Sequence, residues 1–322
     1  MALIQVDTLI KSLREGQGLT QKKLCDGICS QDELSRIERG KRKPDWWTFE
    51  RLMQRLGEDP QRYYTNYVSK SEKHIMDLHI QLKRLLNEET PSSDAEAELL
   101  IAKLEKDKAF KKREHKQFLL RQRATLAFNR GEYKTMIKLS EDALRVTKPN
   151  FDEDKINTYV LFYDEIKLIE QIAVAYFYEE KIENTISILK KLKDTVDKNF
   201  ISRDKGSTDL SILYNLSKFV GLSEKYEEAI AFCDEGVILC KQNYDSHYLP
   251  LFLFNKSICL MRIGMKEEGI NILKKVYALF FALDRLAELE SIKIGLAEHF
   301  GLTVCLEFSC HSHPGEAKAD LQ

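Results

Sequence analysis

The sequence is short of the residues that break helices. Its 322 residues include 14 Gly and 6 Pro, too few for the many tight turns of a β-sandwich or β-barrel. Apolar residues make up 43% and charged residues 31%, proportions that favour long helices. The composition therefore predicts an all-α protein. Because single cores seldom grow beyond about 250 to 300 residues, we expect two domains, or one small domain joined to a repeat array.

Long apolar runs and a net charge are also missing. No run approaches the roughly 18 consecutive apolar residues of a membrane span, so we expect no membrane partner. The formal net charge of −1 excludes a general attraction for polyanions, and any binding of nucleic acid has to come from a local patch. The seven cysteines are scattered, and the chain starts MALIQVDTLIKSL without a basic, then apolar, leader. These features favour a reduced, cytoplasmic protein.

Motifs of catalysis are not found. The sequence has no glycine-rich phosphate loop, no H-E-x-x-H helix and no G-x-S-x-G elbow, so we expect no enzyme and no cofactor. Four residues that could bind a metal lie close together near the end of the chain: Cys305, Cys310, His311 and His313. Their spacing fits no common zinc pattern. We therefore predict no metal site, and we expect residues 305–322 to form a disordered tail.

The first helices are predicted close to the N-terminus. Apolar residues recur at the spacing of one helical face at Val6, Leu9, Ile10 and Leu13. Gly16 and Gly18 end this helix. Thr20 then offers a hydroxyl N-cap for a short helix over residues 21–26, which Gly27 ends.

A third helix begins in the run S-Q-D-E. Ser30 and Glu33 are expected to form a capping box, in which each side chain accepts a hydrogen bond from the other's backbone N–H. Leu34 and Ile37 form the buried face, and Asp45 is the N-cap of a fourth helix. The apolar residues of that helix are Trp46, Phe49, Leu52, Met53 and Leu56. Two short helices separated by a tight glycine turn are typical of a helix-turn-helix, whose second helix enters the DNA major groove.

Positive charge gathers directly after the third helix. Residues 36–43 contain one acid, Glu38, and have a net charge of +4. Their basic residues are Arg36, Arg39, Lys41, Arg42 and Lys43. A local patch of this size suits the phosphates of DNA. The alternative is a small helical domain with a solvated, charged loop.

The segment LTQKKLCDGICSQDELSRIERGKRKP resembles the Cro/repressor-type helix-turn-helix, and GICSQ resembles the version in Rgg- and PlcR-like regulators, over about residues 5–60. The resemblance implies that Gln31, Asp32 and Arg36 face the bases, since Gln pairs with adenine, Arg with guanine and an acid with cytosine. Asp32 equally suits the positive end of its own helix. Phosphate contacts are implied for Gln21, Arg39, Lys41, Arg42 and Lys43. We assign residues 1–66 to this domain.

Residues 67–116 are predicted to be linker helices. One helix is expected over about 68–86 and a basic one over about 94–114, separated by Pro91. Ser92, Ser93 and Asp94 are candidate caps for the second. The basic run over 103–116 is interpreted as a solvated helix face rather than a second DNA site.

Residues 117–304 contain recurring helix pairs. Four segments align on Tyr133, Ile182, Tyr226 and Lys266, which lie 49, 44 and 40 residues apart. Nine residues before these anchors stand small residues: Ala124, Ala173, Ser217 and Ser257. Thirteen before them stand Leu120, Ile169, Leu213 and Leu253, and four after them Ile137, Ile186, Ile230 and Ile270. The pattern resembles the tetratricopeptide (TPR) repeat, with helices longer than usual.

A carboxamide stands eleven residues before every anchor. The four residues of this carboxamide column are Gln122, Gln171, Asn215 and Asn255. In TPR arrays the equivalent position lines the concave groove, so the resemblance implies a ladder of amides that pairs with the backbone of an extended peptide. Flanking candidates for peptide contact are Thr125, Asn129, Tyr178 and Lys218. The alternative is that the amides only bridge neighbouring repeats.

Together the two halves resemble the Rgg, Rap, NprR, PlcR and PrgX group of bacterial peptide-pheromone receptors, of which Rap proteins lack the DNA-binding domain. The resemblance implies a cytoplasmic, homodimeric quorum-sensing transcription regulator. Its expected partners are double-stranded operator DNA and a short signalling peptide. The alternative is a DNA-localised scaffold whose repeats hold a partner protein.

Overall fold

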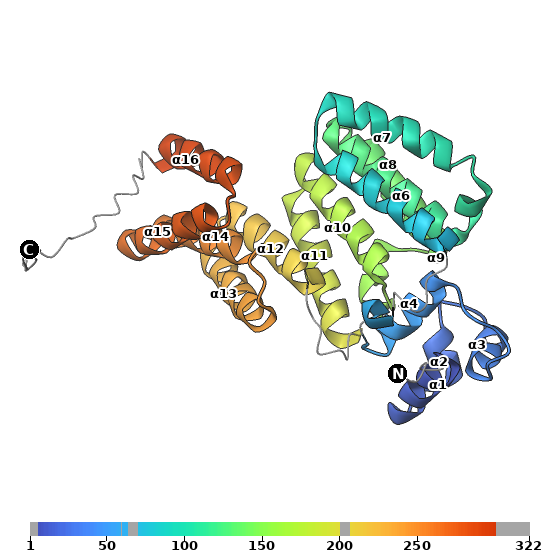
Figure 1. Ribbon diagram of the computed structural model, residues 1–322. Coiled ribbons are helices and arrows are strands. Elements are labelled where there is room, and N and C mark those ends of the chain that lie inside the picture. Colours follow the sequence, from blue (N-terminus) through green and yellow to red (C-terminus); the bar gives the residue numbers. More distant parts are fainter. Residues whose placement is uncertain (1–5, 59, 64–69, 200–206, 301–322) are drawn as a thin grey trace, which may run out of the picture. The chain divides into compact units, whose positions relative to one another are not determined.

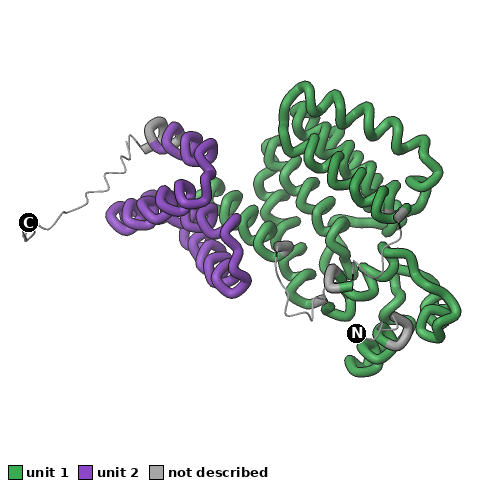
Figure 2. The backbone as a smooth tube through the Cα atoms, viewed as in Figure 1, with its two compact units in different colours: residues 1–225 green, residues 226–322 purple. Residues whose placement is uncertain are grey.

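Helices account for all the regular structure in the described part of the chain. The structure is a computed structural model that describes residues 6–58, 60–63, 70–199 and 207–300, and these contain no strand (Figure 1). The predicted all-α class is confirmed. The chain divides into two compact units, residues 1–225 and 226–322 (Figure 2).

The N-terminal helices follow the predicted caps. They are α1 (Val6–Gly16), α2 (Gln21–Cys25), α3 (Gln31–Glu38) and α4 (Trp46–Arg55), followed by the 3-10 turn η1 (Pro60–Tyr63). The side-chain oxygens of Thr20, Ser30 and Asp45 accept hydrogen bonds from the backbone N–H groups three residues on, at 3.2, 3.1 and 2.9 Å. Gly18 and Gly27 have φ angles of +65° and +70°, which suits glycine at these two turns. The three predicted N-caps are therefore confirmed.

The capping box at Ser30 is only half formed. The Glu33 N–H donates to the Ser30 hydroxyl, but the Glu33 carboxylate lies 3.0 Å from Arg42 Nη2 in an ion pair. The predicted return contact to the Ser30 N–H is thus wrong. An arginine in the following loop offers the carboxylate a charged partner, and a hydrogen bond to a charged group is stronger than one to a neutral amide.

One apolar core holds these helices together. Its innermost residues, with no more than 2% exposure, are Ile10, Leu24, Leu34, Ile37, Trp46, Phe49, Leu52, Met53 and Leu56. All five apolar residues predicted for α4 belong to it. The core fixes the angle between α2 and α3, the two helices of the helix-turn-helix.

The linker region differs in detail from its prediction. The first helix, α6 (Lys70–Asn87), lies as expected, whereas α7 (Pro91–Leu104) starts and ends earlier than predicted. Thr90 is the N-cap of α7 and forms a capping box with Ser93. Of the predicted caps, Ser93 therefore takes part in capping, but neither it nor Ser92 or Asp94 is the N-cap residue. Pro91 occupies the first turn of α7, where its missing N–H is harmless. The basic run is consequently split among the end of α7, the 3-10 turn η2 (Lys108–Lys111) and the start of α8.

Helix pairs follow to the end of the described chain. In the first unit these are α8 (Arg113–Asn129) with α9 (Tyr133–Thr147), the 3-10 turn η3 (Glu153–Thr158), α10 (Tyr163–Tyr178) with α11 (Ile182–Asn199), and α12 (Ser207–Leu222). The second unit holds α13 (Tyr226–Asn243), α14 (Leu249–Arg262), α15 (Lys266–Ala282) and α16 (Leu286–Phe300). Each anchor of the sequence alignment is the first residue of a helix: Tyr133, Ile182, Tyr226 and Lys266. The predicted repeat register is therefore confirmed.

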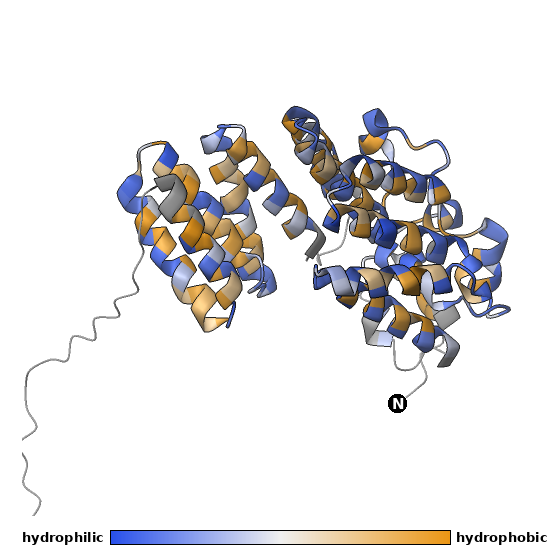
Figure 3. Cartoon of the chain, turned by 90° about the horizontal axis from the view of Figure 1, so that it is seen from above, coloured by the Kyte–Doolittle hydropathy of each residue, from blue (hydrophilic) through white to orange (hydrophobic). Residues whose placement is uncertain are grey.

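Small residues allow the paired helices to approach closely. Ala124, Ala173, Ser217 and Ser257 are 0 to 1% exposed. A Cβ atom added to Gly236 would lie 2.4 Å from the ring of Phe252. The helices carry apolar and polar stripes along their length (Figure 3), so helix–helix packing rather than a single central core holds the array together.

Membrane-spanning helices and metal-binding clusters were searched for in the described part of the chain. Within the described ranges no helix is long and apolar enough to cross a membrane. No group of three or more His, Cys, Asp and Glu side chains that could hold a metal occurs in that same part of the chain. The tail residues Cys305, Cys310, His311 and His313 lie outside the described residues.

Candidate nucleic-acid interface

Helix α3 presents one face to the core and the other to solvent. Leu34 and Ile37 are fully buried, and they fix the rotation of the helix about its axis. Gln31, Asp32 and Arg36 are exposed. The structure thus brings the three predicted base-reading side chains to the surface of one short helix.

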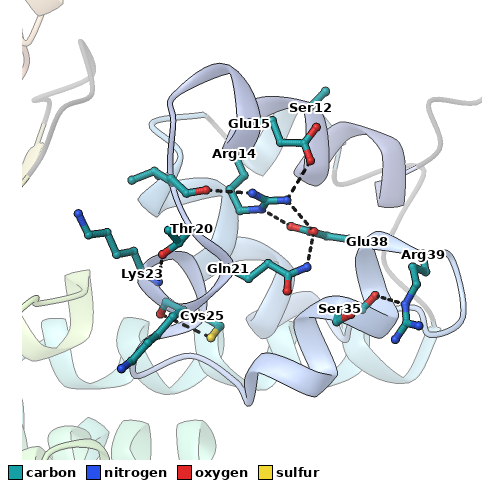
Figure 4. Close-up of polar contacts among 12 residues, drawn as sticks. Ser12, Arg14, Glu15, Thr20, Gln21, Lys23, Cys25, Ser35, Glu38 and Arg39 are labelled. Carbon is teal, nitrogen blue, oxygen red and sulfur yellow. Dashed lines mark hydrogen bonds and ion pairs between the residues drawn. The ribbon is translucent and has the colours of Figure 1, made fainter.

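A buried ion pair locks α3 to the helices before it (Figure 4). The Arg14 guanidinium donates to both oxygens of Glu38, at 2.6 and 2.9 Å, and to the Leu19 carbonyl at 2.9 Å. Gln21 donates its side-chain N–H to Glu38 at 2.8 Å. The Arg14 and Glu38 side chains are 11% and 3% exposed. One carboxylate from α3 therefore ties together α1 and α2.

The protonation of this pair follows from its contacts. Burial alone would raise the pKa of Glu38, but the donors of Arg14 and Gln21 outweigh it and hold that pKa below its ordinary value. The hydrogen bond to Glu38 raises the pKa of Arg14. Both groups are charged at neutral pH.

This ion pair changes the charge that the domain presents at its surface. Glu38 is the only acid of residues 36–43, and it faces Arg14 inside the domain rather than solvent. Arg36, Arg39 and Lys41 are exposed. Glu38 therefore does not offset the exposed positive charge of this segment, whereas Glu33 offsets the charge of Arg42.

The predicted phosphate-binding residues have different environments. Arg39 donates to the Ser35 carbonyl at 3.0 Å, Arg42 pairs with Glu33, and Lys41 and Lys43 are exposed. Gln21 is half-buried and donates to Glu38 within the domain.

Arg55, at the end of α4, was missed by the sequence analysis. Its Nη1 donates to the carbonyls of Lys23, Leu24 and Asp26, at 3.2, 3.1 and 2.5 Å. Its guanidinium carbon lies 4.7 Å from the centre of the Phe162 ring on α10. Burial lowers the pKa of Arg55. Arg55 caps the end of α2 from another helix, about 30 residues later in the sequence. No pattern of neighbouring residues could have predicted this role.

The first repeat helix also contacts the helix-turn-helix. Lys112 Nζ lies 2.8 Å from Asp45 Oδ2, and Arg113 Nη2 donates to the Gly27 carbonyl at 3.2 Å. The rings of Trp47 and His115 meet edge to face, with 4.2 Å between centroids. Lys112 and Arg113 are exposed, as expected for a solvated helix face, but each also has a polar partner in the helix-turn-helix domain.

A polar cavity of about 400 Å³ lies where α4, α6, α8 and α10 meet. Its lining includes Glu50, His79 and Asp164. Burial, followed by the charge of Asp164, raises the pKa of Glu50 to about 7. Burial lowers the pKa of His79 to about 3 and that of the adjacent His115 to about 4. The histidines are therefore neutral at physiological pH, while Glu50 titrates there.

Two residues of the carboxamide column contact the preceding first helix. Gln171 donates to the Thr125 hydroxyl at 2.8 Å, and Asn215 donates to the Glu170 carboxylate at 3.3 Å. Gln122 is 3% exposed. These contacts bridge neighbouring repeats, which is the role that the sequence analysis kept as an alternative to peptide binding.

The flanking candidates vary in accessibility. Asn129 donates to the Leu86 carbonyl and to Asp94, at 3.0 and 2.9 Å. Tyr178 is 41% exposed and stacks on another tyrosine, Tyr133, at 4.5 Å. Lys218 is half-buried, and burial lowers its pKa. The last carboxamide, Asn255, lies half-buried in the second unit.

The fold and this interface define a helix-turn-helix domain followed by TPR-like helix pairs. Residues 8–62 match the family model of a helix-turn-helix domain. Over the whole chain, the fold is similar to that of Bacillus thuringiensis PlcR in complex with the peptide PapR7 and DNA. That match has a TM-score of 0.58 at 20% sequence identity and covers 90% of this chain and 99% of PlcR.

Two further crystal structures are similar. PlcR in its apo form matches with a TM-score of 0.57 at 18% identity, over 90% of this chain and 98% of that one. A variant of the Streptococcus dysgalactiae SHP pheromone receptor Rgg2 matches with a TM-score of 0.51 at 15% identity, over 92% and 99%. No curated protein is matched by sequence. The predicted fold, shared with PlcR and Rgg2, is thereby confirmed.

Proposed function

We propose that this chain is a cytoplasmic transcription regulator, not an enzyme, that binds operator DNA as a homodimer and responds to a short signalling peptide. The observation that carries the proposal is the face of α3. Gln31, Asp32 and Arg36 are exposed there, while the opposite face is fixed by Leu34 and Ile37. An exposed, rigidly held helix in this motif suits the major groove.

In the helix-turn-helix domain, different residues are assigned to the bases and to the phosphates of DNA. Gln31 and Arg36 read bases, with Asp32 as a further base contact, and Arg39, Lys41, Arg42 and Lys43 bind phosphates together with Gln21. The burial of Glu38 against Arg14 supports this assignment, because it removes from the surface the one acid of residues 36–43.

A comparison of Arg36→Ala with Lys43→Ala tests the base-reading assignment. Duplexes are first selected from a random-sequence library by the wild-type chain. Arg36→Ala should relax the preference at one base position by about 1 to 3 kcal/mol, because Arg pairs bidentately with guanine. Lys43→Ala should weaken all duplexes alike and reduce the slope of log affinity against log salt by about one. Equal, sequence-independent losses in both variants would contradict it.

The peptide-binding half is proposed on the first helices of the repeats. The PlcR structure with a similar fold contains the peptide PapR7, which supports a peptide ligand here. We assign contacts to the carboxamide column (Gln122, Gln171, Asn215, Asn255) and to Thr125, Asn129, Tyr178 and Lys218. The main peptide contacts are assigned to Gln171, Asn215 and Lys218. These side chains are only half-buried, so part of their surface can contact a ligand.

The bridging contacts of Gln171 and Asn215 favour a second candidate function, a DNA-localised scaffold whose repeats hold a partner protein. Titration of a library of short hydrophobic peptides separates the two candidates. A peptide that binds and changes the affinity for the selected duplex supports the receptor, and by linkage the duplex should change peptide affinity by the same factor. Co-purification of a cellular protein with the repeats, without any peptide binding, would favour the scaffold.

A further inference from the structure

The turn between α2 and α3 has carbonyl groups that its own helix does not satisfy. A helix of five residues leaves its last carbonyls without intrahelical N–H partners. The Cys25 carbonyl accepts from the N–H groups of Ile28 and Cys29, at 2.9 and 3.1 Å. The carbonyls of Lys23, Leu24, Asp26 and Gly27 accept from arginine side chains instead.

The two arginines belong to different parts of the fold, Arg55 to the helix-turn-helix domain and Arg113 to the first repeat helix. Arg55 belongs to α4 of the same domain and binds three of the carbonyls. Arg113 belongs to α8, the first repeat helix, and binds the Gly27 carbonyl, 86 residues away in sequence. Next to it, Lys112 holds Asp45, the N-cap of α4. Residues at the start of the first repeat helix therefore contact both the turn before α3 and the N-cap of α4.

Packing contributes little at this point. Gly27 is exposed, and a Cβ atom placed there would meet only the Phe162 ring, at 4.0 Å. The turn residues Gly27 to Ser30 line one side of a cavity of about 330 Å³, and Trp47, Arg51 and Arg113 are also in its lining. Ile28 and Cys29 pack against the core of the domain, whereas at the exposed Gly27 van der Waals contacts are few, and the conformation there depends on hydrogen bonds.

We propose that Arg55 and Arg113 are positioning residues for the recognition helix α3, and that Arg113 is the side chain through which the first repeat helix sets the turn before it. The proposal rests on the proposed function, since it concerns how α3 is presented to DNA. A movement of α8 or α10 then reaches the turn through Arg113 and through Phe162 beneath Arg55.

The test is Arg113→Met in the full chain, with Arg130→Met as the matched control. Arg130 stands at the other end of α8, is exposed and pairs with Glu98, so it reports the loss of a surface arginine without touching the turn. Amide hydrogen exchange is measured at Ile28 and Cys29, whose N–H groups close the turn. Loss of one net hydrogen bond should speed exchange there about three- to tenfold in Arg113→Met, with the control at the wild-type rate.

The second readout is discrimination between the duplex selected by the wild-type chain and a scrambled duplex. Discrimination should fall several-fold in Arg113→Met while the melting temperature falls by no more than the few degrees that one hydrogen bond explains, a combination that a merely structural residue would not give. For Arg55, the variant Arg55→Lys should reproduce the faster exchange, because a lysine lacks the fork that spans several carbonyls.

The outcomes are separable. Wild-type exchange at the turn in Arg113→Met, or faster exchange with unaltered discrimination, overturns the positioning role even if the wild-type chain binds DNA well. Failure of the wild-type chain to select any duplex overturns the proposed function, and with it the purpose of the positioning, whatever the exchange rates show.

Discussion

At the scale of single residues, the Arg14–Glu38 pair decides how the recognition helix is held. Both side chains are nearly inaccessible, and the carboxylate accepts three of the hydrogen bonds that join α1, α2 and α3. A buried pair is strongly destabilised when one partner is removed, because the remaining charge stays buried. The pair is therefore a point of high sensitivity to substitution.

Glu38→Ala should lower the free energy of unfolding by about 3 kcal/mol at pH 7, as a buried Arg14 charge loses its partner. Urea unfolding followed by circular dichroism measures it. The matched control is Glu15→Ala, because Glu15 also contacts Arg14, at 3.2 Å, but is 54% exposed and should contribute no more than about 0.5 kcal/mol. Similar losses in both variants would show that the buried geometry has no special weight.

The same pair has a pH signature. The folded-state pKa of Glu38 lies below its ordinary value, so its stabilising effect is complete above the ordinary glutamate pKa of about 4.3. The effect is lost as the pH falls through the folded-state pKa. Glu38→Ala should remove this part of the acid destabilisation.

Local chemistry was predictable at this scale, and distant pairing was not. Thr20, Ser30 and Asp45 were recognised as N-caps because a cap depends on a residue and its three successors. The role of Glu38 was missed, since its partner Arg14 lies 24 residues earlier and a charged side chain in a basic segment reads as solvated. The partner of Glu33 was missed for the same reason.

At the scale of elements, close packing of small residues sets the spacing of the helix pairs. Gly236 on α13 faces the Phe252 ring of α14, and Gly269 on α15 lies against Met261 and the Ser257 carbonyl of the preceding helix. Glycine at these positions lets two helix backbones approach where any side chain would force them apart.

Gly236→Ala should destabilise the second unit by about 1 to 3 kcal/mol, because the new methyl group would lie 2.4 Å from the Phe252 ring and overpack the interface. Gly16→Ala is the control. Nothing lies within 4 Å of a Cβ atom at Gly16, so alanine there should be neutral or stabilise α1 by up to about 1 kcal/mol. The melting temperatures of both variants and of the wild-type chain measure these changes in stability. An unaltered melting temperature in Gly236→Ala would show that α13 and α14 separate without loss.

Element starts were predicted well where a repeated pattern existed. The four anchors coincide with helix starts because their register came from several columns of small and aliphatic residues, which report packing rather than propensity. The start of α7 was misjudged. Pro91 was taken as a break, whereas a proline in the first turn after a threonine cap is compatible with a helix.

At the scale of the whole molecule, the junction between the helix-turn-helix and the repeats within the first unit contains ionisable groups with little solvent. Glu50 on α4 faces Asp164 on α10, with Arg51 and Lys83 as the nearest cations. The pKa of Glu50 is raised to about 7. The folded chain therefore takes up a proton near neutral pH that the unfolded chain takes up only near pH 4.3.

Glu50→Gln should raise the free energy of unfolding by about 1 to 2 kcal/mol at pH 8, where the ionised carboxylate opposes folding. Stability from a raised carboxyl pKa is gained as the pH falls from 7 to about 4.3, so the benefit of the variant should vanish near pH 5. Melting temperatures from pH 5 to 8 measure it, with the exposed Glu96→Gln as control. A benefit independent of pH would exclude Glu50 ionisation as its cause.

The junction was the least predictable part of the molecule. Lys112 and Asp45 are 67 residues apart, and Arg113 and Gly27 are 86 apart. A basic run gives no sign of which of its members meet another domain. Composition and periodicity predicted a helix-turn-helix followed by helical repeats, which the structure confirms. The contacts between the two depend on how α8 passes the helix-turn-helix, and no short sequence pattern encodes that.

The shortness of α2 has a consequence for the exchange of modules. Residues 1–66 do not supply all of their own hydrogen-bond donors, because the Gly27 carbonyl and one oxygen of the Asp45 carboxylate take donors from Arg113 and Lys112. In a chimera that joins residues 1–66 to the repeats of another protein, the Gly27 carbonyl and this Asp45 oxygen would bind water instead. They would keep protein donors only if the new repeat helix had a lysine and an arginine at the positions of Lys112 and Arg113. A chimera that preserves the turn before α3 should therefore include Lys112 and Arg113 together with residues 1–66.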